Sequence, residues 1–368
     1  YLIGIYDQTT ILPGNSEDAI RPSSAPNPDL RWEKTQSANI GMDLSLWDNI
    51  ISLSVDYYYR KGTDLIGLRM LPLETGYTST TVNWAQMENE GVEVALTTRN
   101  IHTKDFTWFT NLNFGYNDNT VLRETVAENA IKPSREGYSV GAIFAYKTAG
   151  LDDEGYPLFL TQDGRKVTAT EFFKLNNAGA STLSAEEQRN LYSYIGSTEP
   201  KVSGGFMNTF KYKRVTLGIN CIFNFGMYVQ TTPTYDPTNY DRGLNSNRDI
   251  LNRWTPDHTN TTLPKLMTEN DGRTGEYLRY KEQNLFRELD IWVKKQNYFR
   301  FESIRLGYEL PEKWLKPVGI KSASVSLEGR NLWVIASNYH NYLDPETMGN
   351  PYAAPIPKSF IFGLNVNF

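Results

Sequence analysis

The sequence predicts an all-β protein whose fold class is a transmembrane antiparallel β-barrel. Apolar and polar residues alternate with period two in nine segments, which is typical of strands that have one apolar and one polar face. The connections between these segments are alternately short and long. The mean hydropathy of the 368 residues is −0.50, and no apolar run approaches the length of a membrane-spanning helix. Helical membrane proteins are therefore excluded.

The first two segments show the alternation clearly. Residues 36–47 place Ile40 and Leu44 on the face opposite Asp43, and residues 50–60 continue the pattern. Asp48-Asn49 between them suits a tight hairpin turn. The same period predicts seven further strands over residues 89–100, 106–117, 200–211, 214–229, 296–310, 320–336 and 358–368.

The connections fall into two classes when these nine strands are laid antiparallel. The short ones are Asp48-Asn49, residues 101–105, Tyr212-Lys213 and residues 311–319. The long ones are residues 61–88, 118–199, 230–295 and 337–357. Structureless loops of this length are unusual in a compact domain, whereas short turns on one side and long loops on the other are typical of outer-membrane barrels. A secreted β-sandwich is the alternative, although its loops are usually shorter.

Two local elements are predicted inside the loop of residues 118–199. Ser184 can cap a short helix over residues 185–194, where Glu186 and Glu187 favour the N-terminal end. Residues 143–147 and 157–160 are expected to form a small hairpin around Asp153-Glu154-Gly155.

The alternation also assigns faces to the predicted barrel strands. Leu217, Ile219 and Cys221 share the lipid-facing side of one strand, which makes a redox role for this single cysteine improbable. The residues expected to face the lumen are Asp43, Asp56, Glu93, Arg99, Asn111, Asn113 and Asn220.

Several kinds of chemistry are not supported by the sequence. A formal net charge of −5 gives no reason to expect a nucleic-acid partner. His102, His258 and His340 lie far apart and have no motif-linked nucleophile, so we expect no enzymatic activity and no cofactor. Asp152-Asp153-Glu154, followed by Asp163, could hold calcium but lacks the spacing of an EF-hand loop. A solvated turn is the preferred interpretation, so no metal site is predicted.

Motifs spread over most of the chain resemble one known family. They include NPDLRWEKT at residues 27–35, VDYYYRK at 55–61, NEGVE at 89–93, RWTP at 253–256 and FRFESIRLGY at 299–308. GRNL at 329–332, DPE at 344–346 and FGLNVNF at 362–368 follow. Together they resemble SusC/RagA-type TonB-dependent transporters of Bacteroidetes outer membranes.

The resemblance implies a plugged barrel of about 22 strands that imports glycans or peptides with energy from the TonB complex. It implies residence in the outer membrane of a Gram-negative bacterium and a SusD-like surface lipoprotein as a partner over the extracellular mouth. Residues 1–368 are accordingly expected to form the C-terminal part of one transmembrane barrel domain, about nine strands with long extracellular loops. The N-terminal plug, the TonB contact and the remaining strands are expected elsewhere.

Aromatic and polar residues in two long loops are candidates for substrate binding, since sugars stack on aromatic rings and pair with amides and carboxylates. The candidates are Tyr235, Asp236, Asn239, Tyr240, Asp241, Arg242, Trp254, Tyr339, Asn341 and Tyr342. For Trp254 and for Asp344-Pro345-Glu346, a structural role that pins loops is the favoured alternative. An extracellular β-rich binding or adhesion domain without transport is the alternative function.

Overall fold

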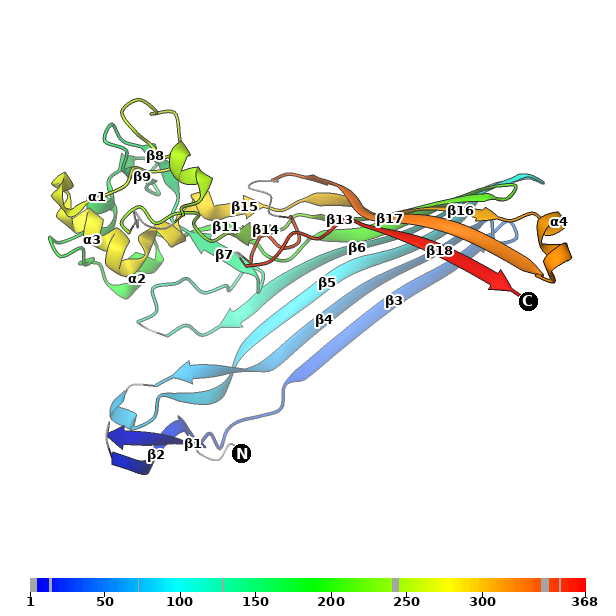
Figure 1. The fold of residues 1–368 in the computed structure, drawn as a ribbon. Helices are drawn as coiled ribbons and strands as arrows, with labels where there is room; N and C mark the ends of the chain where they lie inside the picture. The colour runs from blue at the N-terminus through cyan, green and yellow to red at the C-terminus, as the bar shows by residue number, and fades with distance from the viewer. Residues whose placement is uncertain are drawn as a thin grey trace.

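The computed structural model describes residues 5–12, 15–71, 73–127, 129–239, 245–338, 344–350 and 352–368. Its main feature is a curved sheet in which the nine predicted strands pair antiparallel in sequence order (Figure 1). They are β3 (Lys34–Leu46), β4 (Ile51–Met70), β5 (Ser79–His102), β6 (Phe106–Glu124), β12 (Val202–Tyr212), β13 (Val215–Phe225), β16 (Tyr298–Glu309), β17 (Ser322–Ala336) and β18 (Ser359–Asn367). Within the described residues, β3 pairs only with β4 and β18 only with β17, so the sheet is an open part of a barrel.

The strand register places apolar residues in continuous rows across one face of the sheet. One row crosses eight strands through Leu44, Leu53, Leu96, Leu112, Phe206, Cys221, Phe301 and Trp333. The adjacent row lies on the opposite face and is mostly polar, with Ser45, Ser52, Thr97, Asn111, Met207, Asn220, Ser303 and Arg330. Because the residues expected to face the lumen fall on this second face, the predicted two-sided character of the strands is confirmed.

A bulge keeps this pattern intact in the later strands. Phe301 and Ser303 of β16 pair with Trp333 and Arg330 of β17, so the register skips Glu302 on one strand and two residues on the other. Asn331 in this skipped pair has φ of 54°, a left-handed conformation that asparagine tolerates better than most residues. The bulge lets Phe301 and Ile304 share the apolar face although they are three residues apart.

The short connections lie at one end of the sheet. Trp47, Asp48 and Asn49 all adopt positive φ in the turn between β3 and β4, which confirms the predicted hairpin. The connection of residues 311–319 contains α4 (Glu312–Leu315) and η6 (Lys316–Val318) and ends at Gly319, whose φ is 73°. Figure 1 shows α4 at the end of the sheet opposite the large folded loops.

The expectation of a long loop over residues 61–88 is wrong in this structure. β4 continues to Met70, β5 begins at Ser79, and the two remain paired from Ile51–Thr98 to Met70–Ser79, so only residues 71–78, with η1 (Leu73–Thr75), connect them. A bulge follows Gly62, and polar residues such as Lys61 and Asn83 interrupt the alternation there. The bulge also shifts the phase of the alternation, from Leu53 and Val55 before it to Ile66 and Leu68 after it, so no single continuous pattern reveals the extension.

An N-terminal hairpin joins the sheet beyond these extended strands. β1 (Ile5–Leu12) and β2 (Asn15–Ala25) pair antiparallel, and β2 meets β5 in parallel through Ser24–Ser79 and Ala25–Thr80. The Thr80 hydroxyl donates to the Ala25 carbonyl oxygen at 3.1 Å. Sequence patterning placed no strand in this region.

The two longest loops fold together at the end of the sheet opposite α4 (Figure 1). We call the described residues of 125–201 and 226–297 the cap. The first loop supplies β7 (Ala142–Ala145), β8 (Thr148–Leu151), β9 (Pro157–Leu160), β10 (Lys166–Val167), α1 (Ala169–Phe173), α2 (Ala185–Arg189) and β11 (Ser193–Ser197). The second supplies β14 (Tyr228–Gln230), η2 (Arg248–Asn252), η3 (Glu269–Asp271), α3 (Thr274–Gln283), η4 (Leu285–Glu288), η5 (Asp290–Trp292) and β15 (Val293–Lys295).

The cap has an aromatic core drawn from both loops. Tyr146, Phe159 and Phe173 from the first loop are fully buried, as are Leu285 and Leu289 from the second. Tyr146 meets Phe173 edge to face with ring centroids 4.9 Å apart. Burial of this apolar surface stabilises the contact between the two loops. Each of the two loops therefore supplies part of the core on which the other packs.

The two local predictions inside the first loop had different outcomes. Ser184 caps α2 as expected and forms a capping box with Glu187, although the helix ends at Arg189. The predicted pairing of residues 143–147 with 157–160 is wrong, because β7 pairs with β11 and β9 pairs with β8 and β10. The predicted turn is confirmed, since residues 152–156 connect β8 to β9.

No helix within the described residues is long and apolar enough to cross a membrane.

Candidate functional site

A buried ion pair fixes the last long loop to the polar face of the sheet. Arg300 of β16 lies in the row of Asn113, on the face opposite the apolar rows. Its Nη2 is 2.5 Å from Asp344 Oδ1 and its Nε is 2.5 Å from Glu346 Oε1, and its side chain is only 3% exposed. Pro345 between the two carboxylates is fully buried. The geometry therefore fits the alternative role of Asp344-Pro345-Glu346, which is to pin its loop in place.

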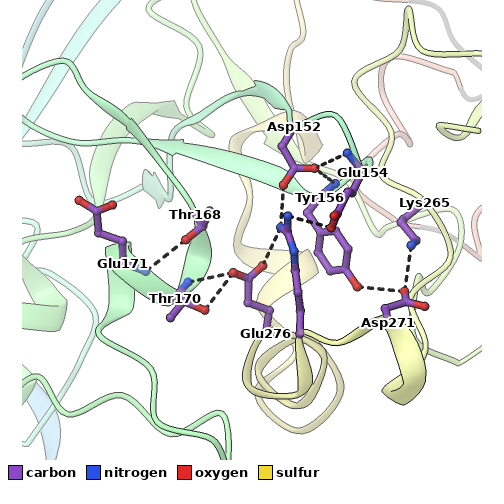
Figure 2. Close-up of polar contacts among 10 residues, drawn as sticks. Asp152, Glu154, Tyr156, Thr168, Thr170, Glu171, Lys265, Asp271 and Glu276 are labelled. Atoms are coloured by element: carbon purple, nitrogen blue, oxygen red, sulfur yellow. Dashed lines mark hydrogen bonds and ion pairs between the residues drawn. The ribbon is translucent and has the colours of Figure 1, made fainter. Parts of the chain in front are cut away.

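A second charged network closes the cap between its two loops (Figure 2). The Asp152 carboxylate accepts the backbone N–H groups of Glu154 and Tyr156 and contacts Arg273 Nη1 at 2.6 Å. Arg273 also pairs with Glu154 at 2.9 Å. A guanidinium thus occupies the position considered for calcium. No cluster of His, Cys, Asp or Glu with metal-binding geometry occurs in the part of the chain that the structure describes.

Asp271 forms the other half of this network. Its carboxylate accepts the Tyr156 hydroxyl at 2.9 Å and the Thr268 hydroxyl at 2.6 Å, and it lies 3.0 Å from Lys265 Nζ. Burial raises the pKa of Asp271, but the hydrogen bonds from Thr268, Lys265 and Tyr156 outweigh it and hold the pKa well below its usual range. The ionised carboxylate therefore joins η3 to the turn between β8 and β9.

Replacing Asp271 with Asn should loosen the cap and weaken its acid sensitivity. A carboxylate with a lowered pKa contributes its full stabilisation above the ordinary aspartate pKa of about 3.9 and loses it as the pH falls through the lowered value. We expect Asp271→Asn to cost about 1–3 kcal/mol at neutral pH. Hydrogen exchange of residues 265–280 at pH 7 and under acid conditions measures this. Equal protection in the two proteins at pH 7 would argue against the network.

The described candidates for substrate binding separate into buried and exposed residues. Tyr235 is 8% exposed and its hydroxyl donates to the Pro264 carbonyl oxygen at 2.7 Å, so it belongs to the cap core. Asp236 and Asn239 are exposed, and Asp236 accepts the Asn239 backbone N–H in a local turn. Tyr240, Asp241, Arg242, Tyr339, Asn341 and Tyr342 lie outside the described residues.

Trp254 packs against the turn between β8 and β9. A Cβ atom at Gly155 would lie 2.5 Å from Trp254 Cδ2, and Gly155 has φ of 82°, so only glycine fits there. The Trp254 backbone N–H donates to the Leu263 carbonyl oxygen at 2.8 Å. These contacts fit a structural role in which Trp254 pins the loop, the alternative to direct contact with a ligand.

A cavity of about 330 Å³ lies between the cap and the segments that follow β17. It is lined by segments that follow β14, precede β15 and follow β17, including Thr234, Trp292 and Asn338. Met348, just beyond the residues that Arg300 holds, also lines it. Sequence patterning missed this cavity because its lining comes from five separate segments with no shared motif.

The histidines lie apart. His102 is the last residue of β5, next to the short turn, whereas His258 is in the cap with Nδ1 3.1 Å from the Arg253 carbonyl oxygen. His340 lies outside the described residues. The two described histidines, His102 and His258, therefore do not lie together in one site.

Known proteins share both the sequence and this architecture. A family model described as the β-barrel of TonB-dependent receptor-like proteins matches residues 6–144. TonB-dependent receptor P3 of Formosa agariphila is 27% identical over 375 residues, which cover 93% of this chain and 35% of the relative. TonB-dependent receptor SusC of Bacteroides thetaiotaomicron is 23% identical over 367 residues, which cover 93% of this chain and 32% of SusC. The chain spans about a third of the length of these relatives.

Solved structures of the RagAB peptide transporter have the same fold. One gives a TM-score of 0.75 at 24% identity, and the "closed-closed" state gives 0.75 at 25% identity. Each match covers 100% of this chain and 39% of the other. The chain is therefore similar to TonB-dependent receptors, and its fold is that of part of a β-barrel of the SusC and RagA type.

Proposed function

We propose that the complete protein imports oligosaccharides across the outer membrane of a Gram-negative bacterium, using energy from the TonB complex. The observation that carries this proposal is the two-faced sheet, with an apolar row over eight strands on one side and a polar row on the other. Such a sheet suits a wall between lipid and an aqueous passage. Relatives named TonB-dependent receptors support the energy source.

A SusD-like surface lipoprotein is the proposed partner. The cap presents an ordered surface beyond the sheet, and the exposed Asp236 and Asn239 remain our candidates for polar contact with substrate or partner. Ordered loops far larger than strand connection requires usually serve binding. An oligopeptide is the second substrate candidate, favoured by the similarity to RagAB, which is named a peptide transporter.

Uptake by intact cells tests the import function. Cells that produce the complete protein should accumulate labelled oligosaccharide only while the proton gradient and TonB are intact, and a lipoprotein should copurify in mild detergent. Accumulation of peptides alone would reverse the substrate preference. Surface binding without energy-dependent accumulation would instead favour the adhesion alternative.

A further inference from the structure

The short connections at the α4 end of the sheet form a rim that hydrogen bonds tie together. We define the rim as residues 47–50, 103–105, 211–214 and 309–322. The Lys213 backbone N–H donates to the Asp105 carbonyl oxygen at 2.7 Å, and the Arg214 guanidinium donates to the Leu310 carbonyl oxygen at 3.0 Å. Side chains from connections that are distant in the sequence are therefore held close to one another.

Basic side chains outnumber acidic ones in the rim. The basic residues are Lys104, Lys211, Lys213, Arg214, Lys313, Lys316 and Lys321, and the acidic residues are Asp48, Asp105, Glu309 and Glu312. Lys211 pairs with Glu309 at 2.8 Å, and Lys316 pairs with Glu312 at 3.5 Å. Lys104, Lys213, Lys313 and Lys321 are exposed, and no carboxylate lies within 4.0 Å of their ammonium groups in the described part of the chain. The rim thus presents a net positive charge.

The apolar face of the sheet ends at this rim in a row that is rich in aromatic residues. The row consists of Phe106, Tyr212, Val215, Tyr308, Val325 and Leu364. Tyr212 is 55% exposed, and the Lys213 ammonium lies 5.4 Å from the centroid of its ring. This cation–π contact places a positive charge on the apolar side of the rim.

The connection of residues 311–319 adds an amphipathic element to the rim. α4 contacts β17, and Leu315 of α4 and Ala323 on the apolar side of β17 are only 7% and 8% exposed. Trp314 and Val318, by contrast, are 58% and 66% exposed. Large apolar side chains beside lysines are typical of a membrane interface, where an indole ring lies among the headgroups and an ammonium reaches water.

We infer that the rim binds anionic phospholipids of the leaflet that faces the periplasm. Short turns lie on the periplasmic side of outer-membrane barrels, so the rim lies at the level of the phospholipid headgroups. A headgroup phosphate complements the ammonium groups of Lys213, Lys313 and Lys321, and the acyl chains continue along the apolar face beyond Tyr212. Zwitterionic headgroups carry no net charge and gain less from this rim. The inference rests on the proposed outer-membrane location and is independent of the transported substrate.

A triple variant with Lys213→Gln, Lys313→Gln and Lys321→Gln tests the role of the charge. The complete protein is placed in nanodiscs of equal amounts of phosphatidylglycerol and phosphatidylcholine, and native mass spectrometry measures the ratio of the two lipids that it retains. We expect the wild type to enrich phosphatidylglycerol and the variant to reduce this enrichment about fivefold. High salt should also weaken the enrichment in the wild type, because the lysines are exposed.

A second triple variant, with Lys147→Gln, Lys166→Gln and Lys281→Gln, is the matched control. These lysines are exposed in the cap, and the Lys281 ammonium also lies over a tyrosine ring, 5.6 Å from the centroid of Tyr277. The control should enrich phosphatidylglycerol like the wild type. Heat-modifiable migration in SDS gels verifies that both triple variants contain a folded barrel.

Trp314→Phe tests the depth of the rim in the bilayer. Phospholipids brominated close to the headgroup quench nearby tryptophans, so this substitution should remove part of the quenched emission. Unchanged quenching would place Trp314 away from the headgroups and count against the inference. Equal lipid enrichment in the wild type and the rim variant, or equal losses in the rim and cap variants, would overturn it.

The transport assay separates this inference from the proposed import. Loss of energised uptake in the rim variant with unchanged lipid enrichment would assign the rim to the TonB complex and overturn lipid binding. Rim-dependent lipid enrichment in a protein that takes up no oligosaccharide would reject the proposed import and leave lipid binding standing.

Discussion

A Leu112→Arg substitution should destabilise the membrane-inserted sheet by about 2–4 kcal/mol, the cost of an arginine near the bilayer midplane. Leu112 lies on β6 between Leu96 of β5 and Phe206 of β12, in the apolar row that crosses eight strands. A guanidinium there would sit among hydrocarbon groups with no partner. Urea unfolding of the complete protein in lipid vesicles measures the loss.

The neighbouring residue supplies the control. Asn113 is exposed on the opposite face of the same strand, so Asn113→Arg places the same charge one position away in the polar passage. We expect the control to lose much less stability than Leu112→Arg. Similar losses in the two variants would contradict the assignment of the faces.

Arg300→Leu should release residues 344–350 from the sheet. It leaves the Asp344 and Glu346 carboxylates without their cation in a buried setting, and breaking such a pair costs about 3–5 kcal/mol. The chain can avoid this cost by moving the segment into water, so the expected result is local detachment while the barrel persists. Hydrogen exchange and protease cleavage within residues 344–350 report it.

Arg305→Leu is the matched control on the same strand and the same face. Arg305 is exposed and its described hydrogen bond is a long one to Ser326 at 3.4 Å, so its loss should leave the segment protected. Arg300→Lys should restore protection only in part, because an ammonium cannot reproduce the two directed contacts of the guanidinium. Equal protection in Arg300→Leu and Arg305→Leu would show that the ion pair does not hold the loop.

The sequence predicts the barrel strands well because each strand separates lipid from water along its whole length. Leu96, Leu112 and Phe206 must all face lipid, which imposes a period of two that a single sequence reveals. Beyond the membrane this constraint ends. The paired extensions of β4 and β5 contain a bulge after Gly62 that breaks the alternation, so the pattern predicts a loop there.

The cap and the candidate site were far less predictable. Phe159 and Leu289 belong to one core but come from loops separated by the β12–β13 hairpin, and no local pattern links them. The role of Arg300 depends on two carboxylates that are distant in sequence, Asp344 at a separation of 44 residues and Glu346 at 46. The sequence identifies Tyr235 and Trp254 as aromatic candidates for substrate binding, but only packing distinguishes a core residue from an exposed one.

The shared core of the cap also constrains how the protein is made. Tyr146 and Phe173 precede the β12–β13 hairpin in the chain, whereas Leu285 and Leu289 follow it. The core cannot close until both loops have reached the same side of the membrane, which makes it a late, high-contact-order step of biogenesis. Until then its aromatic surface is exposed to solvent, where aggregation competes with folding.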